Sequence, residues 1–367
     1  MRFASCTEQI EISGIRKCFE GARQGAINLG LGQPDFDTPA HIKEAAIKSI
    51  HEGFTGYTPN CGFPELRSAI AEKFRRENGI TCSLEEIMVT SGASEALFLA
   101  ISALVDRGDE VLIGDPSFLS YSALTKLVGG MPVSVPLNKD LRLSPDAVLE
   151  RITDRTKAIV INSPANPTGA VQTEEEIHAL ADIADDKDLA LISDEVYEHF
   201  IYDGTHVSPG RYSDNVITIN AVSKTYAMTG WRLGYLIAKG CALEQLLKAH
   251  QYIQACACSI SQKAAYAAIT GPQDCVAKMR DEFRSRRDLL VEGFRDMGVD
   301  LIVPQGAFYL FPTVGDGDAV SAQLAKAGVI VVPGSAFGSG GREHIRLSYA
   351  ASRSNLEESL KRMRNIL

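Results

Sequence analysis

The sequence predicts an α/β fold in which a large domain is built around a mostly parallel sheet. Short apolar runs typical of buried strands recur over the first two thirds of the chain, and helical patterns separate several of them. The length of 367 residues also suits two domains better than one. After about residue 270 the pattern changes to a long charged helix and short strands, so we expect a second, smaller α/β part there.

Seven apolar runs are the candidate strands of the large sheet. A run that is apolar throughout is typical of a strand that is buried on both faces of a parallel sheet. Helical patterns at Glu65–Glu77 and Thr173–Asp186 predict that helical crossovers join such strands. The runs are Ile87–Thr90, Glu110–Ile113, Pro132–Val135, Ala158–Ile161, Ala190–Ile192, Val216–Ile219 and Leu233–Ala238.

The C-terminal part has a different predicted order of elements. A long charged helix is expected at Val276–Met297 and a closing helix at Asn355–Asn365. Between them we expect short strands at Val299–Val303, Phe308–Phe311 and Val329–Val332. The sequence contains no internal repeat, low-complexity tract or obvious flexible linker.

Composition and charge argue against several classes of protein. The chain is 45% hydrophobic and has a formal net charge of −9, which disfavours a general nucleic-acid or anionic-membrane surface. No charged-then-apolar leader begins the sequence, and no apolar run approaches membrane-spanning length. We therefore expect a soluble cytoplasmic protein that binds neither nucleic acid nor membrane.

The eight cysteines are scattered along the chain, and only two of them lie close together. No second cluster completes a zinc site, and a cytoplasmic context disfavours disulfides. We therefore expect no metal site and interpret the cysteines as small core or surface residues. They are Cys6, Cys18, Cys61, Cys82, Cys241, Cys256, Cys258 and Cys275.

The segment after the strand candidate Val216–Ile219 is the most informative chemically. Ser223 and Lys224 follow that run, and Arg232 comes eight positions after the lysine. A lysine amine has an ordinary pKa of about 10.4, so at neutral pH it is mostly protonated and a poor nucleophile. An imine formed between the lysine and an aldehyde avoids this difficulty, because an incoming amino acid exchanges with the imine directly. Guanidinium and hydroxyl groups suit a phosphate dianion. The pattern therefore suits a covalently held, phosphorylated aldehyde, namely pyridoxal phosphate, although a lysine after an apolar strand is more commonly a solvated strand end.

Two other strand ends supply candidate partners for the ring of that cofactor. Asp194 ends the apolar run that begins at Leu189, and a carboxylate there can pair with a protonated pyridine nitrogen. At about 4 Å such an attraction amounts to about 4 kcal/mol at an effective dielectric constant of about 20. Tyr197 and Asn166 are candidate partners of the ring's phenolic oxygen. Taken alone, Asp194 is equally typical of a helix N-cap, and the segment around Asn166 is more typical of a turn.

Together these motifs carry a family resemblance. The chain resembles the class I/II, fold-type I pyridoxal-phosphate-dependent aminotransferases, in the group of archaeal and thermophilic aspartate and aromatic aminotransferases. The match extends from residues 13–16 (SGIR) and 31–39 (LGQPDFDTP) to residues 345–350 (IRLSYA). The resemblance implies a large cofactor-binding domain at residues 46–270 with a mixed, mostly parallel seven-stranded sheet between helices. Residues 1–45 and 271–367 would form a small domain that closes over the substrate.

The resemblance also assigns cofactor contacts in the first half of the chain. Gly92, Ala93 and Ser94 would form the phosphate cradle, where backbone amides at a helix start favour an anion by up to about 2 kcal/mol. Phe118 would stack on the pyridine ring. Tyr57 would reach across a dimer interface to the phosphate in the neighbouring subunit, which implies a homodimer with shared active sites.

Substrate binding is assigned in the same way. Arg346 resembles the family's carboxylate-binding arginine, and a bidentate guanidinium–carboxylate pair would place the bond to be broken perpendicular to the ring. Gly32 would add a backbone amide near the same carboxylate, and Asn166 would also contact the substrate. Tyr309 is interpreted as structural.

The reaction implied by the resemblance is transamination. Lys224 would hold the cofactor as a Schiff base and then remove the α-proton as general base, with Asp194 and Tyr197 completing the catalytic set. The amino group of an L-amino acid would pass to a 2-oxo acid such as 2-oxoglutarate with ping-pong kinetics.

Three other functions were weighed against transamination. A nicotinamide dehydrogenase needs a glycine-rich fingerprint, which residues 30–35 only half match. A non-enzymatic regulator needs an added DNA-binding segment, and the match begins almost at Met1. A pyridoxal-phosphate-dependent C–S lyase on the same fold would share Lys224, Asp194 and Arg232, so it remains an alternative.

The preferred amino donor is left open between aspartate, an aromatic amino acid and a broad range. Some aspartate-specific relatives place a lysine in the cradle where this chain has Ser94, which favours aromatic or broad specificity. Arg16 could still supply a second cation, although a solvated helix position is the commoner role for such a residue.

Overall fold

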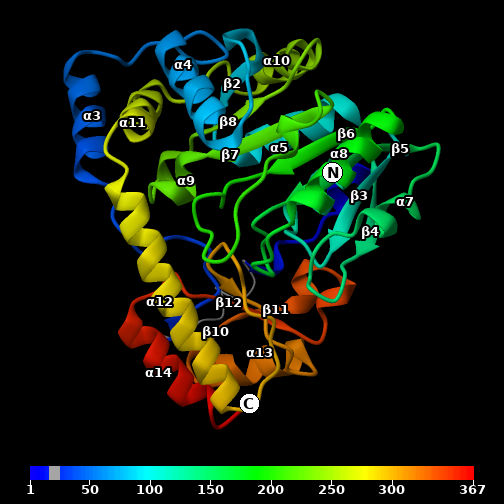
Figure 1. Cartoon of the computed structure of the whole chain (residues 1–367), viewed down its shortest axis with the longest axis vertical. Helices are drawn as coiled ribbons and strands as arrows, with labels where there is room; N and C mark the ends of the chain where they lie inside the picture. Colours follow the sequence, from blue (N-terminus) through cyan, green and yellow to red (C-terminus); the bar gives the residue numbers. More distant parts are fainter. Residues whose placement is uncertain (16–24) are drawn as a thin grey trace.

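A seven-stranded sheet forms the centre of the upper half of the molecule (Figure 1), in a computed structural model that describes residues 1–15 and 25–367. The strand order is β2-β8-β7-β6-β5-β3-β4. Each of the seven strands predicted for the large sheet is present, so the predicted α/β class is confirmed. The bounds are β2 Ile87–Thr90, β3 Glu110–Asp115, β4 Met131–Pro136, β5 Thr156–Asn162, β6 Ala190–Asp194, β7 Val216–Ala221 and β8 Gly234–Ile237.

The sheet is mixed and mostly parallel, as predicted. Strand β8 runs antiparallel to both of its neighbours, β2 and β7, whereas the remaining pairs are parallel. Residues of β2 alternate between two hydrophobic clusters, with Met88 on one face and Ile87 and Val89 on the other. Both faces of the sheet are therefore covered, which explains why the strand sequences are apolar without interruption.

Helices cover both faces. Helices α5 and α10 pack on one face, while α3, α4, α8 and α11 pack on the other. The predicted helix at Thr173–Asp186 is α8, and it begins with a capping box: the Thr173 hydroxyl accepts from the amide of Glu176, and the Glu176 carboxylate accepts from the amide of Thr173. The bounds are α3 Ala40–His51, α4 Pro64–Lys73, α5 Ala93–Leu104, α6 Ser120–Leu127, α7 Pro145–Leu149, α8 Glu174–Asp186, α9 Val222–Thr225, α10 Ala242–Ile253 and α11 Ser259–Thr270.

The C-terminal part forms the lower half of Figure 1, and α12 runs along its side. A three-stranded sheet has the order β11-β12-β9, and the N-terminal strand β1 pairs in parallel with β10. The N-terminal segment therefore joins the C-terminal part, although the domain boundaries at residues 45 and 270 stay a prediction. The bounds are β1 Ile27–Asn28, α12 Asp274–Asp296, β9 Tyr309–Leu310, α13 Gly317–Lys326, β10 Val329–Ile330, β11 Val332–Pro333, β12 Ile345–Ser348 and α14 Arg353–Met363.

Two predicted strands of this part need correction. Residues 299–303 form no strand, because the side chains of Val299, Leu301 and Val303 pack against the core without any pairing of their backbone into a sheet. The predicted strand Val329–Val332 is two strands of different sheets, β10 and β11. Hydrophobic patterning located both segments but did not determine their backbone pairing.

The remaining elements are short. The expected helix Glu65–Glu77 is α4 followed by a π-helical turn, η1, at Phe74–Asn78. No helix among the described residues is long and apolar enough to span a bilayer. The other short helices are α1 Ser5–Glu8, η2 Leu84–Glu86, η3 Pro209–Arg211, η4 Thr229–Trp231, η5 Gly334–Phe337 and η6 Ser339–Gly341.

Candidate active site

The carboxyl ends of the parallel strands border a cavity of about 220 Å³. The loops that follow strand ends at one sheet edge are the usual place for ligand sites in open α/β sheets. Eleven of the thirteen predicted site residues line this cavity, which brings together residues from both ends of the chain. They are Gly32, Ala93, Ser94, Phe118, Asn166, Asp194, Tyr197, Ser223, Lys224, Arg232 and Arg346.

Lys224 lies in the short helix α9, directly after β7, and its ammonium group donates to the carbonyl oxygen of Gly32 at 2.5 Å. Burial, together with the like charges of Arg232 and Arg346, lowers the pKa of Lys224 to about 8. About one molecule in ten is then unprotonated at neutral pH. The fold therefore gives Lys224 the unprotonated fraction that attack on an aldehyde needs.

Asp194 is the last residue of β6, and its carboxylate is buried. One oxygen accepts from the hydroxyl of Tyr121 at 2.7 Å, and the other accepts from the amide of Val196 at 3.4 Å. Burial raises the pKa of Asp194 to about 6, against the opposing effect of the Tyr121 hydrogen bond. A carboxylate in this setting is stabilised by any cationic group that enters the cavity.

Tyr121 is a cavity residue that the sequence reasoning missed. It is buried in α6, three positions after Phe118, and the two rings pack edge to face with centroids 5.7 Å apart. Phe118 lies just before α6, so the available signal was two aromatic residues close together in the sequence, not a shared helix face. The signal becomes specific only once β6 brings Asp194 to the same place.

Two more tyrosines, Tyr197 and Tyr309, also line the cavity. The hydroxyl groups of Tyr197 and Tyr309 are 2.7 Å apart, and burial raises the pKa of Tyr197 well above its ordinary value. A Cβ atom added to Gly32 would lie 2.1 Å from the Tyr309 hydroxyl, so glycine allows the close approach of these two segments. Tyr309, interpreted from the sequence as structural, therefore shapes the site as well.

Arg346 lies on β12 with only 1% of its surface exposed. One guanidinium nitrogen donates to the side-chain oxygen of Asn166 at 3.1 Å, and another donates to the carbonyl of Gly30. The guanidinium carbon lies 4.6 Å from the ring centre of Tyr309 and 4.9 Å from that of Phe337. A buried guanidinium held in this way presents a planar receptor for a carboxylate.

The start of α5 and Arg232 lie together at the cavity, an arrangement that suits an anion. Gly92 has a φ of +78° and precedes the first helical residue, so its backbone turns the amides of the first helical turn toward the cavity. A Cβ atom on Gly92 would lie 2.6 Å from a guanidinium nitrogen of Arg232. Arg232 therefore lies directly against the cradle that Ala93 and Ser94 continue.

Tyr57 lies apart from the cavity. Its side chain is 90% exposed, and it precedes α4 on the surface of the large-sheet half. The proposed contact across an interface stays a prediction. Arg16 and Cys18 lie outside the described residues, and the other seven cysteines are free.

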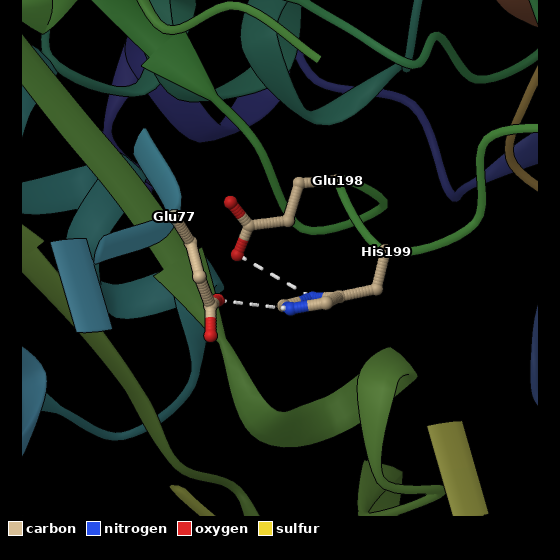
Figure 2. A group of neighbouring side chains, drawn as sticks. All are labelled: Glu77, Glu198 and His199. Atoms are coloured by element: carbon tan, nitrogen blue, oxygen red, sulfur yellow. Dashed lines mark hydrogen bonds and ion pairs between the residues drawn. The ribbon is translucent and has the colours of Figure 1, made fainter. Parts of the chain in front are cut away.

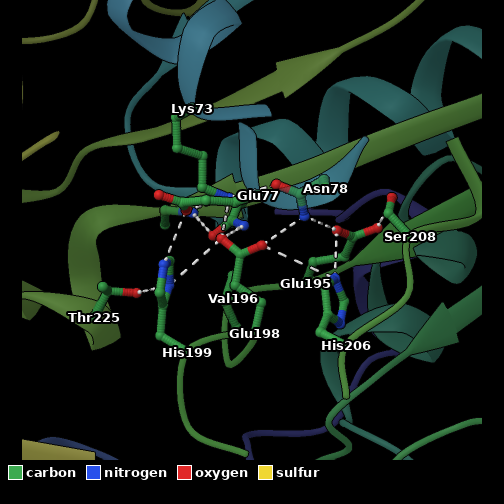
Figure 3. A network of polar contacts seen from close by, with 12 residues as sticks. Lys73, Glu77, Asn78, Glu195, Val196, Glu198, His199, His206, Ser208 and Thr225 are labelled. Atoms are coloured by element: carbon green, nitrogen blue, oxygen red, sulfur yellow. Dashed lines mark hydrogen bonds and ion pairs between the residues drawn. The ribbon is translucent and has the colours of Figure 1, made fainter. Parts of the chain in front are cut away.

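A buried polar network lies beside the site, around the turn that follows β6. Glu77, Glu198 and His199 approach one another (Figure 2), and Glu195, Glu198 and His206 form an overlapping group (Figure 3). Within each group the potential ligand atoms lie within 4.8 Å of one another, which would permit a metal ion.

The network already contains a cation of the chain itself, the side chain of Lys73. The ammonium group of Lys73 contacts Glu198 and lies 3.6 Å from Glu77 (Figure 3), and it lowers the pKa of Glu198 against the effect of burial. His199 lies 3.2 Å from the hydroxyl of Thr225, which follows Lys224 in the chain. We therefore interpret the network as the support of the Lys224 segment, not as a metal centre.

Residues 24–363 match the model of the family described as aminotransferase class I and II. The chain belongs to this family. A probable aspartate aminotransferase of Methanocaldococcus jannaschii is 46% identical over 97% of each chain. An aromatic-amino-acid aminotransferase 2 of Thermococcus litoralis is 40% identical over 100% of this chain and 98% of the relative.

The fold comparison agrees with the sequence comparison. The aspartate aminotransferase of Thermus thermophilus, solved with maleate, superposes on this aminotransferase with a TM-score of 0.96 at 39% identity, over the full length of both chains. The predicted family, fold class and type of reaction are therefore confirmed. Enzymes of this family depend on pyridoxal phosphate, and the cavity contains the groups such a cofactor requires.

Proposed function

We propose that this aminotransferase moves the amino group of an L-amino acid to a 2-oxo acid such as 2-oxoglutarate, with pyridoxal phosphate held through Lys224. The convergence of Lys224, Asp194 and Arg346 in one cavity is the observation that carries the proposal. The Lys224 amine, with its lowered pKa, suits reaction with an aldehyde. The buried carboxylate of Asp194 suits a pyridine nitrogen, and the buried guanidinium of Arg346 suits an amino-acid carboxylate.

The residues around the cavity fit the parts of the cofactor. Arg232, Ser223 and the start of α5 would hold the phosphate, and Asp194 would face the ring nitrogen. Tyr197 and Asn166 would contact the phenolic oxygen. When bound, the cofactor accepts the electron pair left on the α-carbon as a proton departs.

The chain's own residues then control the proton. Arg346 binds the substrate carboxylate and so orients the α-carbon, because a bidentate pair fixes both position and rotation. The Nζ atom of Lys224, with a pKa of about 8, accepts the α-proton and later returns it, since a base of this strength both gains and loses a proton near neutrality. Asp194 and Arg346 are buried and Lys224 is half-buried, which limits the access of water to that transfer.

We propose a substrate range that is aromatic or broad. Three cationic side chains of the described residues line the cavity: Lys224, Arg232 and Arg346. Each already has a role, so none of these described cations is left for a second substrate carboxylate. The apolar part of the lining includes Ile15, Leu97 and Phe118, which suits an uncharged side chain.

We also propose a homodimer that completes each site. Exposed apolar side chains lie on α3 and around the end of α10, and Asn60 donates to the carbonyl oxygen of Ala255, which ties the Tyr57 segment to that region. Exposed apolar side chains of this kind favour association. The exposed side chains are Ile47, Ile50, Tyr57, Tyr252 and Ile253.

Half-reaction spectra with aspartate, tyrosine and alanine test the proposal, because each competent donor converts the cofactor without a second substrate. We expect conversion by tyrosine and none by the K224A variant, which should fold normally. Normal transamination by K224A would refute the role of Lys224, while conversion by alanine without tyrosine would refute the aromatic preference. With cysteine as a fourth amino acid, release of pyruvate, ammonia and sulfide in place of transamination would indicate the C–S lyase.

A further inference from the structure

His250 is a buried histidine that the reaction scheme does not use. It lies on α10, which packs against α5, and its side chain is fully buried. Its Nδ1 atom is 2.8 Å from a carboxylate oxygen of Glu95, and its Nε2 atom is 2.9 Å from the carbonyl oxygen of Asn60. Both ring nitrogens therefore face acceptors.

Glu95 connects this histidine to the phosphate cradle. It is the third residue of α5, and its second carboxylate oxygen accepts from the amide of Ser91, just before Gly92. Gly92 precedes the helix and has no side chain with which to cap it, so Glu95 fixes the entry into the cradle from inside the first turn. The geometry of the cradle thus depends on a carboxylate.

A carboxylate in that place has an electrostatic cost. A unit negative charge within one helical turn of a phosphate dianion would weaken the binding of that dianion by about tenfold in a partly buried site. Glu95 has only 8% of its side chain exposed, so water screens it poorly. The cradle therefore needs the hydrogen bond that the Glu95 carboxylate accepts from Ser91, but not the negative charge of that carboxylate.

His250 resolves this conflict. A carbonyl oxygen only accepts hydrogen bonds, so the Nε2 atom that faces Asn60 carries a hydrogen. The contact of Nδ1 with Glu95 requires one more proton, which resides either on the ring or on the carboxyl group. The pair Glu95–His250 has no net charge in either case.

We propose that His250 is a positioning residue for the cofactor phosphate: it neutralises Glu95, so that Glu95 orders the cradle without repelling the phosphate. The inference rests on the proposed function, because it presumes that pyridoxal phosphate binds at this cradle. His250 also ties this cradle to Asn60, three residues after Tyr57, so one contact links the cradle to the segment that would reach the phosphate of the neighbouring subunit.

Equilibrium binding to the cofactor-free full chain tests the proposal. Pyridoxal phosphate and pyridoxal share an aldehyde and a ring, so the ratio of their dissociation constants isolates the phosphate. In H250Q we expect pyridoxal phosphate to bind about tenfold more weakly while pyridoxal changes less than about twofold. The double variant E95Q/H250Q should regain most of the lost ratio. H178Q, at an exposed histidine of α8, is the matched control and should leave the ratio unchanged.

Three results would overturn the inference. An unchanged ratio in H250Q would do so, as would a double variant no better than H250Q. E95Q gives an independent test if H250Q does not fold, since the proposal expects its ratio to stay within about threefold of wild type. Tenfold tighter phosphate-dependent binding in E95Q would mean that Glu95 carries an uncompensated charge. A wild-type chain that forms no cofactor complex at all would refute the proposed function instead.

Discussion

Replacing Asp194 by Asn should stabilise the cofactor-free protein at pH 8 while abolishing transamination. Burial raises the pKa of Asp194 from its ordinary 3.8 to about 6. That difference corresponds to about 3 kcal/mol by which the ionised carboxylate destabilises the folded chain at pH 8. Asparagine has the same shape without the charge, and reorienting its contacts with Tyr121 and Val196 costs about 1 kcal/mol. We expect a net gain of about 2 kcal/mol.

The sign of the pH dependence follows from the raised pKa. The folded chain binds the Asp194 proton more tightly than the unfolded chain, so the stability from this proton is complete below pH 3.8 and is lost as pH rises through 6. The advantage of D194N should therefore shrink from about 2 kcal/mol at pH 8 to below about 1 kcal/mol at pH 5.

Urea unfolding of the cofactor-free chain, followed by circular dichroism at both pH values, measures this advantage. D37N is the matched control, because the side chain of Asp37 is 92% exposed and its replacement should give no pH-dependent gain. A D194N protein that is no more stable at pH 8, or whose gain is equal at the two pH values, would refute the reasoning from burial.

Three further predictions follow from the buried groups. Acylation of Lys224 in the cofactor-free chain, read by mass spectrometry, should have a midpoint near pH 8; a midpoint above about pH 10 would contradict its burial. Y121F removes a hydrogen bond to Asp194 of about 1.5–3 kcal/mol, so the carboxylate competes more strongly for the ring proton and the rate of the half-reaction should fall about 10- to 100-fold; an unchanged rate would contradict this role. K73M leaves Glu198 buried without its cation, so urea unfolding should show a loss of about 3–5 kcal/mol, and a loss below about 1 kcal/mol would mean that the network is solvated.

The large sheet was predictable because its strands are buried on both faces. A run such as Ala158–Ile161 has no polar position, so its burial and its extended backbone follow from composition and length alone. Residues 299–303 are apolar at every position except Asp300, but they form no strand. Their side chains reach the core from one side only, and a sequence does not say whether a neighbouring backbone is free to pair.

Site residues were predictable where they follow a strand within a motif. Lys224, Asp194 and Asn166 each stand a few residues beyond an apolar run, and parallel strands bring such ends together. Tyr121 and His250 were missed because their partners are distant in sequence, 73 and 155 positions away. A buried tyrosine or histidine has no local signature until the fold supplies the carboxylate beside it.

The two arginines of the cavity influence the pKa of Lys224 differently before and after an anion binds. Arg232 and Arg346 lower the pKa of Lys224 and are also the proposed receptors for the phosphate and the substrate carboxylate. An anion bound to either arginine offsets the like charge that the lysine experiences, so ligand binding raises the proton affinity of the amine. Lys224 is therefore most nucleophilic when the cavity is free of anions, and it becomes a stronger base once the substrate carboxylate is bound. That order suits the roles proposed for Lys224, which would first react as an amine and later accept the α-proton.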